Sequence, residues 1–114
     1  MSTIKSFTSL EQSRKLAEML PLESADMSYE VREDLDGYIT KTIYTPLIHT
    51  PYNDNYIPCW NLAALLNILP SATLDSSDDH HYRVHCNERF TDWYDNSVDA
   101  CIAMIEKLYK LNLL

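Results

Sequence analysis

Glycine is almost absent from this chain of 114 residues, in which Gly37 is the single example. Phosphate-binding loops need several glycines, because a backbone without Cβ lets its N–H groups come close to the anion. Gly37 follows Asp36, and this dipeptide is a strong signal for the tight turn of a β-hairpin. The shortage of glycine therefore argues against nucleotide binding by a Gly-rich loop.

Long apolar runs are also missing. The longest nearly apolar stretch, residues 62–69, is much shorter than the about 20 residues that a helix needs to cross a bilayer. The first residues lack the apolar core of a secretory signal. Three cysteines, Cys59, Cys86 and Cys101, are an odd number at wide spacing, which fits a reducing compartment better than a disulfide framework. We therefore expect a cytoplasmic protein without membrane association.

Positive charge is scarce as well: 9 Lys and Arg stand against 17 Asp and Glu, which gives a formal net charge of −8. The excess comes from two acidic stretches, residues 23–36 and 75–99. Such a field repels the phosphates of nucleic acids and anionic lipids, so we expect neither as a partner. It suits a basic partner protein, although surface acids also keep a small domain soluble. A further hypothesis, that the surface imitates DNA, requires both stretches to lie on one face.

What is present is an ordinary globular composition, with 46% hydrophobic and 23% charged residues. At this length we expect one complete domain spanning residues 1–114. Its clearest element is a helix that begins after Asn96, a favourable N-cap, and closes at Asn112, which tolerates the left-handed conformation. Apolar residues follow at spacings of three and four and predict one buried stripe: Val98, Cys101, Ile102, Ile105, Leu108 and Tyr109.

Two further helices are predicted. The first has Thr8 and Glu11 as its capping box and stops at Pro21. The second begins at Pro58, continues through a segment that is apolar nearly all round, and ends at Pro70.

Strand patterns occupy most of the remaining chain. Residues 27–35 and 38–45 predict a hairpin around Gly37, and residues 82–86 alternate as a third strand with a short continuation at 90–94. Residues 46–58 and 71–81 are turn-prone and predict two exposed loops. This order of elements favours an α+β fold, with a small antiparallel sheet of three to four strands and about three helices packed on it.

The sharpest chemical cluster lies between residues 78 and 86, where His81, His85 and Cys86 could serve as metal ligands beside Asp78 and Asp79. On an extended strand, however, His81 and His85 lie too far apart to bind one ion. A solvated loop that runs into a strand explains these residues more simply, so we predict neither a metal site nor a cofactor. No motif marks any cysteine or carboxylate pair as catalytic, and we assign no catalytic residues.

The best binding candidate is a run of aromatic and amide side chains in the first loop, with Trp60 behind it. Such side chains on loops are frequent tools of protein recognition. The alternative is that these tyrosines fold back over the sheet. The predicted binding residues are Tyr52, Asn53, Asp54, Asn55, Tyr56 and Trp60.

Three blocks taken together, residues 20–27, 57–70 and 94–108, resemble a group of short uncharacterised proteins of gut Bacteroides-type bacteria and of their prophages or mobile elements. The resemblance spans most of the chain. It implies a bacterial cytoplasmic origin and supports a single domain. It supplies no catalytic residues.

Two functions of different classes follow from the sequence. The leading hypothesis is a non-enzymatic, cytoplasmic protein-binding module of phage or mobile-element descent, which contacts its partner through the acidic surface or the Tyr/Asn loop. The alternative is a small enzyme or a metal- or ligand-binding protein that uses His81, His85 and Cys86 or the 51–58 loop. Trp60, Trp93 and the tyrosines could also form an apolar patch for a homodimer.

Overall fold

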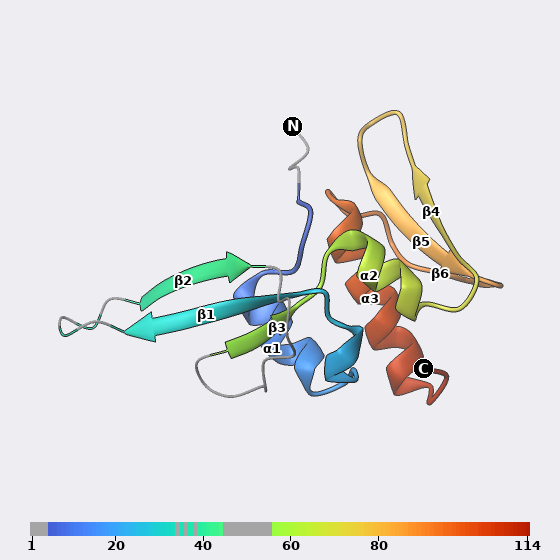
Figure 1. The fold of residues 1–114 in the computed structure, drawn as a ribbon. Coiled ribbons are helices and arrows are strands. Elements are labelled where there is room, and N and C mark those ends of the chain that lie inside the picture. The colour runs from blue at the N-terminus through green and yellow to red at the C-terminus, as the bar shows by residue number, and fades with distance from the viewer. Residues whose placement is uncertain (1–4, 34, 36, 38, 45–55) are drawn as a thin grey trace. The chain divides into compact units, whose positions relative to one another are not determined.

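Three α-helices and six strands make up the described part of the chain, which is residues 5–33, 35, 37, 39–44 and 56–114 of a computed structural model (Figure 1). The contacts divide the chain into two compact units. We call residues 8–61 the hairpin unit, and residues 1–7 together with 62–114 the terminal unit. Each unit has its own sheet, and the prediction of a single domain stays a prediction.

The hairpin unit contains an antiparallel sheet with the strand order β2-β1-β3. The predicted hairpin is confirmed, because β1 and β2 pair along their length. The last pair is Glu33 with Ile39, so residues 34–38 connect the strands instead of the predicted two-residue turn. Gly37 lies in this connection and has a φ of 85° that suits glycine. Helix α1 packs against β3, and the buried apolar side chains of this unit include Leu16, Ile57 and Trp60. The elements are α1 (Leu10–Ala17), a 3-10 turn η1 (Leu22–Ser24), β1 (Met27–Glu33), β2 (Ile39–Tyr44) and β3 (Tyr56–Cys59).

Helix α1 begins one residue later than predicted. Ser9 is its N-cap and forms the capping box with Gln12, whereas the sequence favoured Thr8 with Glu11. Both pairs have the right spacing, but Thr8 is fully buried and its hydroxyl is used inside the unit. The helix ends at Ala17, before Pro21.

The terminal unit contains a second antiparallel sheet with the strand order β4-β5-β6, and α3 packs against both β5 and α2. Val84 and Cys86 of β5 are buried together with Cys101, Met104 and Ile105 of α3. This apolar layer is the core of the unit. The elements are α2 (Leu62–Ile68), β4 (Ala72–Ser76), β5 (Tyr82–Cys86), β6 (Arg89–Phe90) and α3 (Ser97–Lys110).

The last helix agrees with its prediction in nearly every detail. The Asn96 side chain accepts a hydrogen bond from the Asp99 N–H at 2.8 Å, and Asn112 has a φ of 57°. Its stripe is buried from Val98 to Leu108, but Tyr109 is 45% exposed and does not belong to it. No helix in the described ranges is long and apolar enough to cross a membrane.

The predicted strand continuation at 90–94 is limited to β6 at Arg89–Phe90 and a single bridge between Tyr82 and Tyr94. Two other segments form a different type of element than predicted. Residues 56–59 form strand β3, so Pro58 does not start a helix, and α2 begins only at Leu62. Proline is tolerated there because β3 lies at the edge of its sheet. Residues 72–76, predicted as loop, form the edge strand β4. The α+β class is therefore confirmed, and in the described residues three α-helices are present and the strands form two three-stranded sheets instead of one.

Candidate functional site

The solvent-facing side of the second sheet brings together charged and aromatic side chains from three strands. Successive residues of a strand point to opposite faces, so Arg83 and His85 lie on the side away from buried Val84. The register then places Asp75 of β4 directly opposite Arg83, and Phe90 of β6 opposite His85. The four side chains therefore share one face of the β4-β5-β6 sheet.

One carboxylate organises the two basic groups of this face. Asp75 Oδ2 accepts a hydrogen bond from Arg83 Nε at 3.1 Å and lies 3.6 Å from His85 Nε2. The side chains of Asp75, Arg83 and His85 are 30%, 34% and 27% exposed. Water screens such half-exposed pairs, so their contribution to stability is small, and their main effect here is to orient the guanidinium and the imidazole.

Two aromatic rings lie against the same guanidinium. Its central carbon is 4.8 Å from the ring centre of Phe90 and 4.6 Å from that of Trp93. The imidazole of His85 stacks on Phe90 with ring centres 5.0 Å apart. Phe90 and Trp93 nevertheless remain 45% exposed. We call Asp75, Arg83, His85, Phe90 and Trp93 the aromatic–arginine face.

This arrangement offers binding chemistry. Cation–π contacts hold the guanidinium and the rings in fixed relative positions, and this lowers the conformational entropy that a partner would have to remove on binding. Trp and Arg are the residue types most enriched among the energetically dominant residues of protein interfaces, and aromatic side chains in general are enriched there. The face therefore has the composition of an interface centre in an otherwise acidic chain.

The three candidate metal ligands considered in the sequence, His81, His85 and Cys86, do not converge. His81 Nε2 lies 3.6 Å from an oxygen of Asp95, whereas His85 shares Asp75 with Arg83. Cys86 is buried on the opposite side of β5, where burial raises the pKa of its thiol. Within the described residues, no group of three His, Cys, Asp or Glu side chains is placed to hold a metal ion.

The predicted binding loop lies mostly outside the described residues, because these do not include Tyr52, Asn53, Asp54 and Asn55. Tyr56 is half-buried in β3. Trp60 is fully buried, and its indole N–H donates to the Ser24 hydroxyl at 2.9 Å. Trp60 thus belongs to the interior of the hairpin unit, and the proposal that this loop binds a partner stays a prediction.

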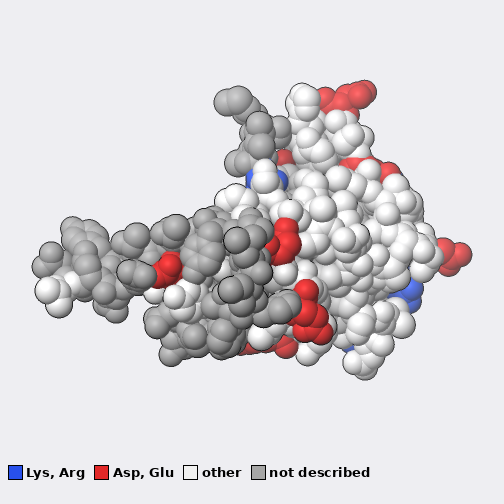
Figure 2. Space-filling view, in the orientation of Figure 1, with Lys and Arg blue, Asp and Glu red and all other residues white. Residues whose placement is uncertain are grey.

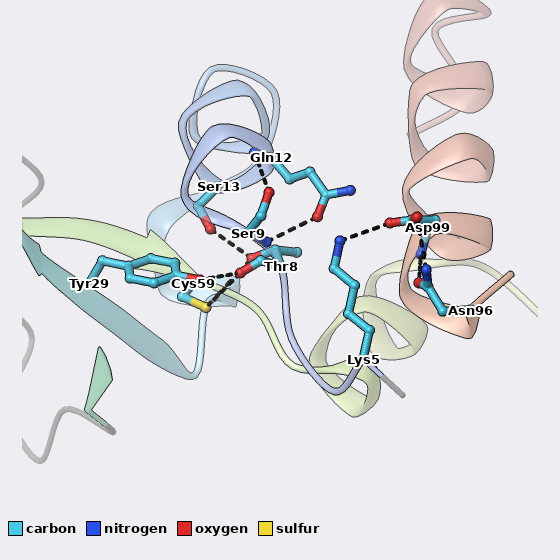
Figure 3. A network of polar contacts seen from close by, with 9 residues as sticks. All are labelled: Lys5, Thr8, Ser9, Gln12, Ser13, Tyr29, Cys59, Asn96 and Asp99. Carbon is cyan, nitrogen blue, oxygen red and sulfur yellow. Dashed lines mark hydrogen bonds and ion pairs between the residues drawn. The ribbon is translucent and has the colours of Figure 1, made fainter. Parts of the chain in front are cut away.

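A second polar cluster lies inside the hairpin unit, where the Tyr29 hydroxyl donates to the Thr8 carbonyl at 2.7 Å (Figure 3). The Thr8 and Ser13 hydroxyls are 2.7 Å apart, and the Thr8 hydroxyl donates to Cys59 Sγ at 3.5 Å. Burial raises the pKa of Tyr29 to about 12 and also raises the pKa of Cys59. A buried thiol with a raised pKa is a poor nucleophile at neutral pH, and the hydrogen bonds of this cluster connect the start of α1 to β1 and β3.

The aromatic–arginine face was only partly visible in the sequence. The sequence predicts an apolar surface patch with Trp93 and a strand that holds Arg83 and His85 on one side, but it does not predict the contact of Arg83 with Phe90 and Trp93. The signal that could have revealed this contact is a tight turn at Asn87, which has a φ of 57° and places Phe90 opposite His85.

Comparisons with protein-family models, curated proteins and solved structures find no match to this chain.

Proposed function

We propose that this chain is a non-enzymatic, cytoplasmic protein-binding module whose contact surface is the aromatic–arginine face. The observation that carries the proposal is the exposure of Phe90 and Trp93, each 45%, around one guanidinium. A partner that covers both rings removes their remaining apolar surface from water, and this is the main favourable term in most protein association. Descent from a phage or mobile element remains part of this proposal.

The kind of partner follows from charge. At a net charge of −8, nucleic acids and anionic membranes are repelled, so the partner we propose is a protein. The two acidic stretches of the sequence fall in different units, so a single acidic stripe is not part of the proposal.

The test is a quantitative affinity purification from cells that express the chain natively. We expect a partner to be captured by the wild-type chain and lost on Trp93→Ala or Phe90→Ala, because both changes remove ring surface without touching the buried core. Tyr109→Ala is the matched control, since Tyr109 is an aromatic residue of the same unit with the same 45% exposure.

Each other outcome counts against the proposal. Partners that bind the Trp93→Ala and wild-type chains equally would place the contact elsewhere on the molecule. A stoichiometric metal ion or small molecule without any protein partner would favour the alternative, an enzyme or ligand-binding protein that uses His81, His85 and Cys86 or the 51–58 loop.

A further inference from the structure

The backbone hydrogen bonds of β5 show in which direction the N–H and C=O groups of the neighbouring strand β4 point. Val84 donates its N–H to the Thr91 hydroxyl and accepts from the Thr91 N–H, while Tyr82 exchanges both backbone bonds with Tyr94. The even-numbered residues of β5 therefore direct their backbone groups away from β4. In an antiparallel pair these directions alternate, so Arg83 and His85 direct theirs toward β4.

The register transfers this alternation to β4. Thr73 and Asp75 stand opposite His85 and Arg83 and bond to β5, so the intervening residues Ala72, Leu74 and Ser76 direct their N–H and C=O groups to the outer side. Figure 1 draws β4 along the outside of this sheet. In the part of the chain that the structure describes, no strand pairs with that side and no backbone bond reaches it.

The described edges at β6 and β3 are interrupted. The carbonyl of Phe90 in β6 accepts a hydrogen bond from Lys107 Nζ at 3.1 Å, and β6 is only two residues long. Edge strand β3 contains Pro58, which has no N–H to offer. Strand β4 has five residues in continuous register, with no proline, lysine or bulge. Apart from the charge of Asp75, it therefore lacks the devices that usually protect an edge strand from pairing.

We propose that the outer edge of β4 binds an extended segment of a basic partner protein as an added strand. This inference rests on the proposed function and describes how the partner is held beside the aromatic–arginine face. Main-chain hydrogen bonds to Ala72, Leu74 and Ser76 would supply affinity. Alternate side chains of the added strand would lie beside half-buried Leu74 on one face, and beside Thr73 and Asp75 on the other.

Charge selects a basic segment. Asp75 lies on β4 itself, and Asp78 and Asp79 are exposed in the loop that joins β4 to β5. Figure 2 shows acidic residues at the tip of this β4–β5 hairpin. Arg83 is the only Lys or Arg within residues 72–86, and it is already paired with Asp75. A second copy of the chain would instead bring another acidic hairpin to this edge, at a cost from like-charge repulsion.

The first test uses the full chain and two synthetic peptides, one of alternating Val and Lys and one of alternating Val and Glu. We expect the Val/Lys peptide to shift the NMR amide signals of Ala72, Leu74 and Ser76 and to slow their hydrogen exchange. In the free chain these three amides should exchange faster than those of Thr73 and Asp75, which bond to β5. The Val/Glu peptide should produce no such shifts.

Two variants separate edge pairing from side-chain packing. Leu74→Pro removes one outward N–H and leaves the bonds to β5 in place, so it should abolish binding of the Val/Lys peptide. Leu74→Ala keeps that N–H, and its affinity should stay within about tenfold of the wild type, which corresponds to about 1.4 kcal/mol. Circular dichroism confirms that each variant is folded before binding is compared.

Several results would overturn the inference. They are slow exchange of the Leu74 amide in the free chain, amide shifts that leave β4 untouched, and equal binding of both peptides. Protection that appears with rising protein concentration alone would show that a second copy occupies the edge. None of these results changes the outcome for Trp93→Ala in the affinity purification, so failure of this inference and failure of the proposed function are distinguishable.

Discussion

At the scale of single residues, Thr8 takes part in several of the buried hydrogen bonds of the hairpin unit. Its N–H donates to the Trp60 carbonyl at 2.9 Å, its hydroxyl accepts from the Trp60 N–H at 3.2 Å, and its carbonyl accepts from the Tyr29 hydroxyl at 2.7 Å. Thr8 is fully buried, and these contacts satisfy its polar groups. One residue, through its backbone and its hydroxyl, thereby joins the start of α1 to β1 and to the end of β3.

Thr8→Val should therefore lower the free energy of unfolding by about 1–3 kcal/mol, because the shape is kept while the buried Trp60 N–H loses its acceptor. Urea denaturation followed by circular dichroism measures the change. Thr73→Val is the control, since Thr73 is exposed on a strand and should change stability by less than about 0.5 kcal/mol. Equal stability of the Thr8→Val and wild-type chains would show that this hydrogen bond carries no weight.

At the scale of elements, the helices differ in how far local sequence specifies them. Helix α3 has its cap, its first-turn acid and its apolar stripe within its own residues, and it forms as the sequence predicts. Residues 56–59 carry an ambiguous signal, because proline suits both the first turn of a helix and an edge strand. Pairing with β1, which lies about thirty residues earlier in the sequence, selects the strand.

The cap of α3 can be tested against a matched substitution. Asn96→Ala should lower stability by about 1 kcal/mol, because the Asp99 N–H loses its acceptor at the helix start. Asn67→Ala is the same change at an exposed position inside α2, where alanine is the better helix former, so it should stabilise slightly. Thermal unfolding of both variants gives the comparison, and two shifts of the same sign would contradict the capping role.

At the scale of the whole molecule, buried titratable groups make stability depend on alkaline pH. Burial raises the pKa of Cys101 from 9.0 to about 12 and that of Tyr29 from 10.0 to about 12. The folded chain therefore holds these protons more tightly than the unfolded chain. Their contribution to stability is complete below about pH 9 and is lost as the pH rises toward 12.

We expect the urea concentration at the unfolding midpoint of the wild-type chain to decrease as the pH is raised from neutral to about 11. Cys101→Val removes one of the titrating groups while keeping an apolar side chain of similar size, so its midpoint should fall less steeply over the same range. The comparison of slopes is independent of any difference in stability at neutral pH. Parallel slopes for the two chains would rule out Cys101 as a source of the alkaline loss.

The candidate site illustrates what sequence can and cannot supply at this scale. Alternation along β5 placed Arg83 and His85 on one side, and an apolar patch with Trp93 was expected. The contact of Arg83 with Phe90 and Trp93 depends on the turn after Cys86 and on the pairing of β6. A strand of two residues is too short to give a recognisable sequence pattern. The free edge of β4 was missed because its residues were assigned to a loop.

By itself the sequence determined the elements whose stabilising contacts lie within a few residues: helix α3 with its Asn96 cap, the hairpin that has Gly37 in its connection, and the alternating strand β5. The tertiary structure alone decided that residues 56–59 and 72–76 are strands, that Thr8 is buried, and that Phe90 lies against Arg83. The physical reason is the range of the interactions. The hydrogen bonds of caps and turns join residues that are only a few positions apart in the sequence. Strand pairing and burial depend on partners that only the folded chain brings together.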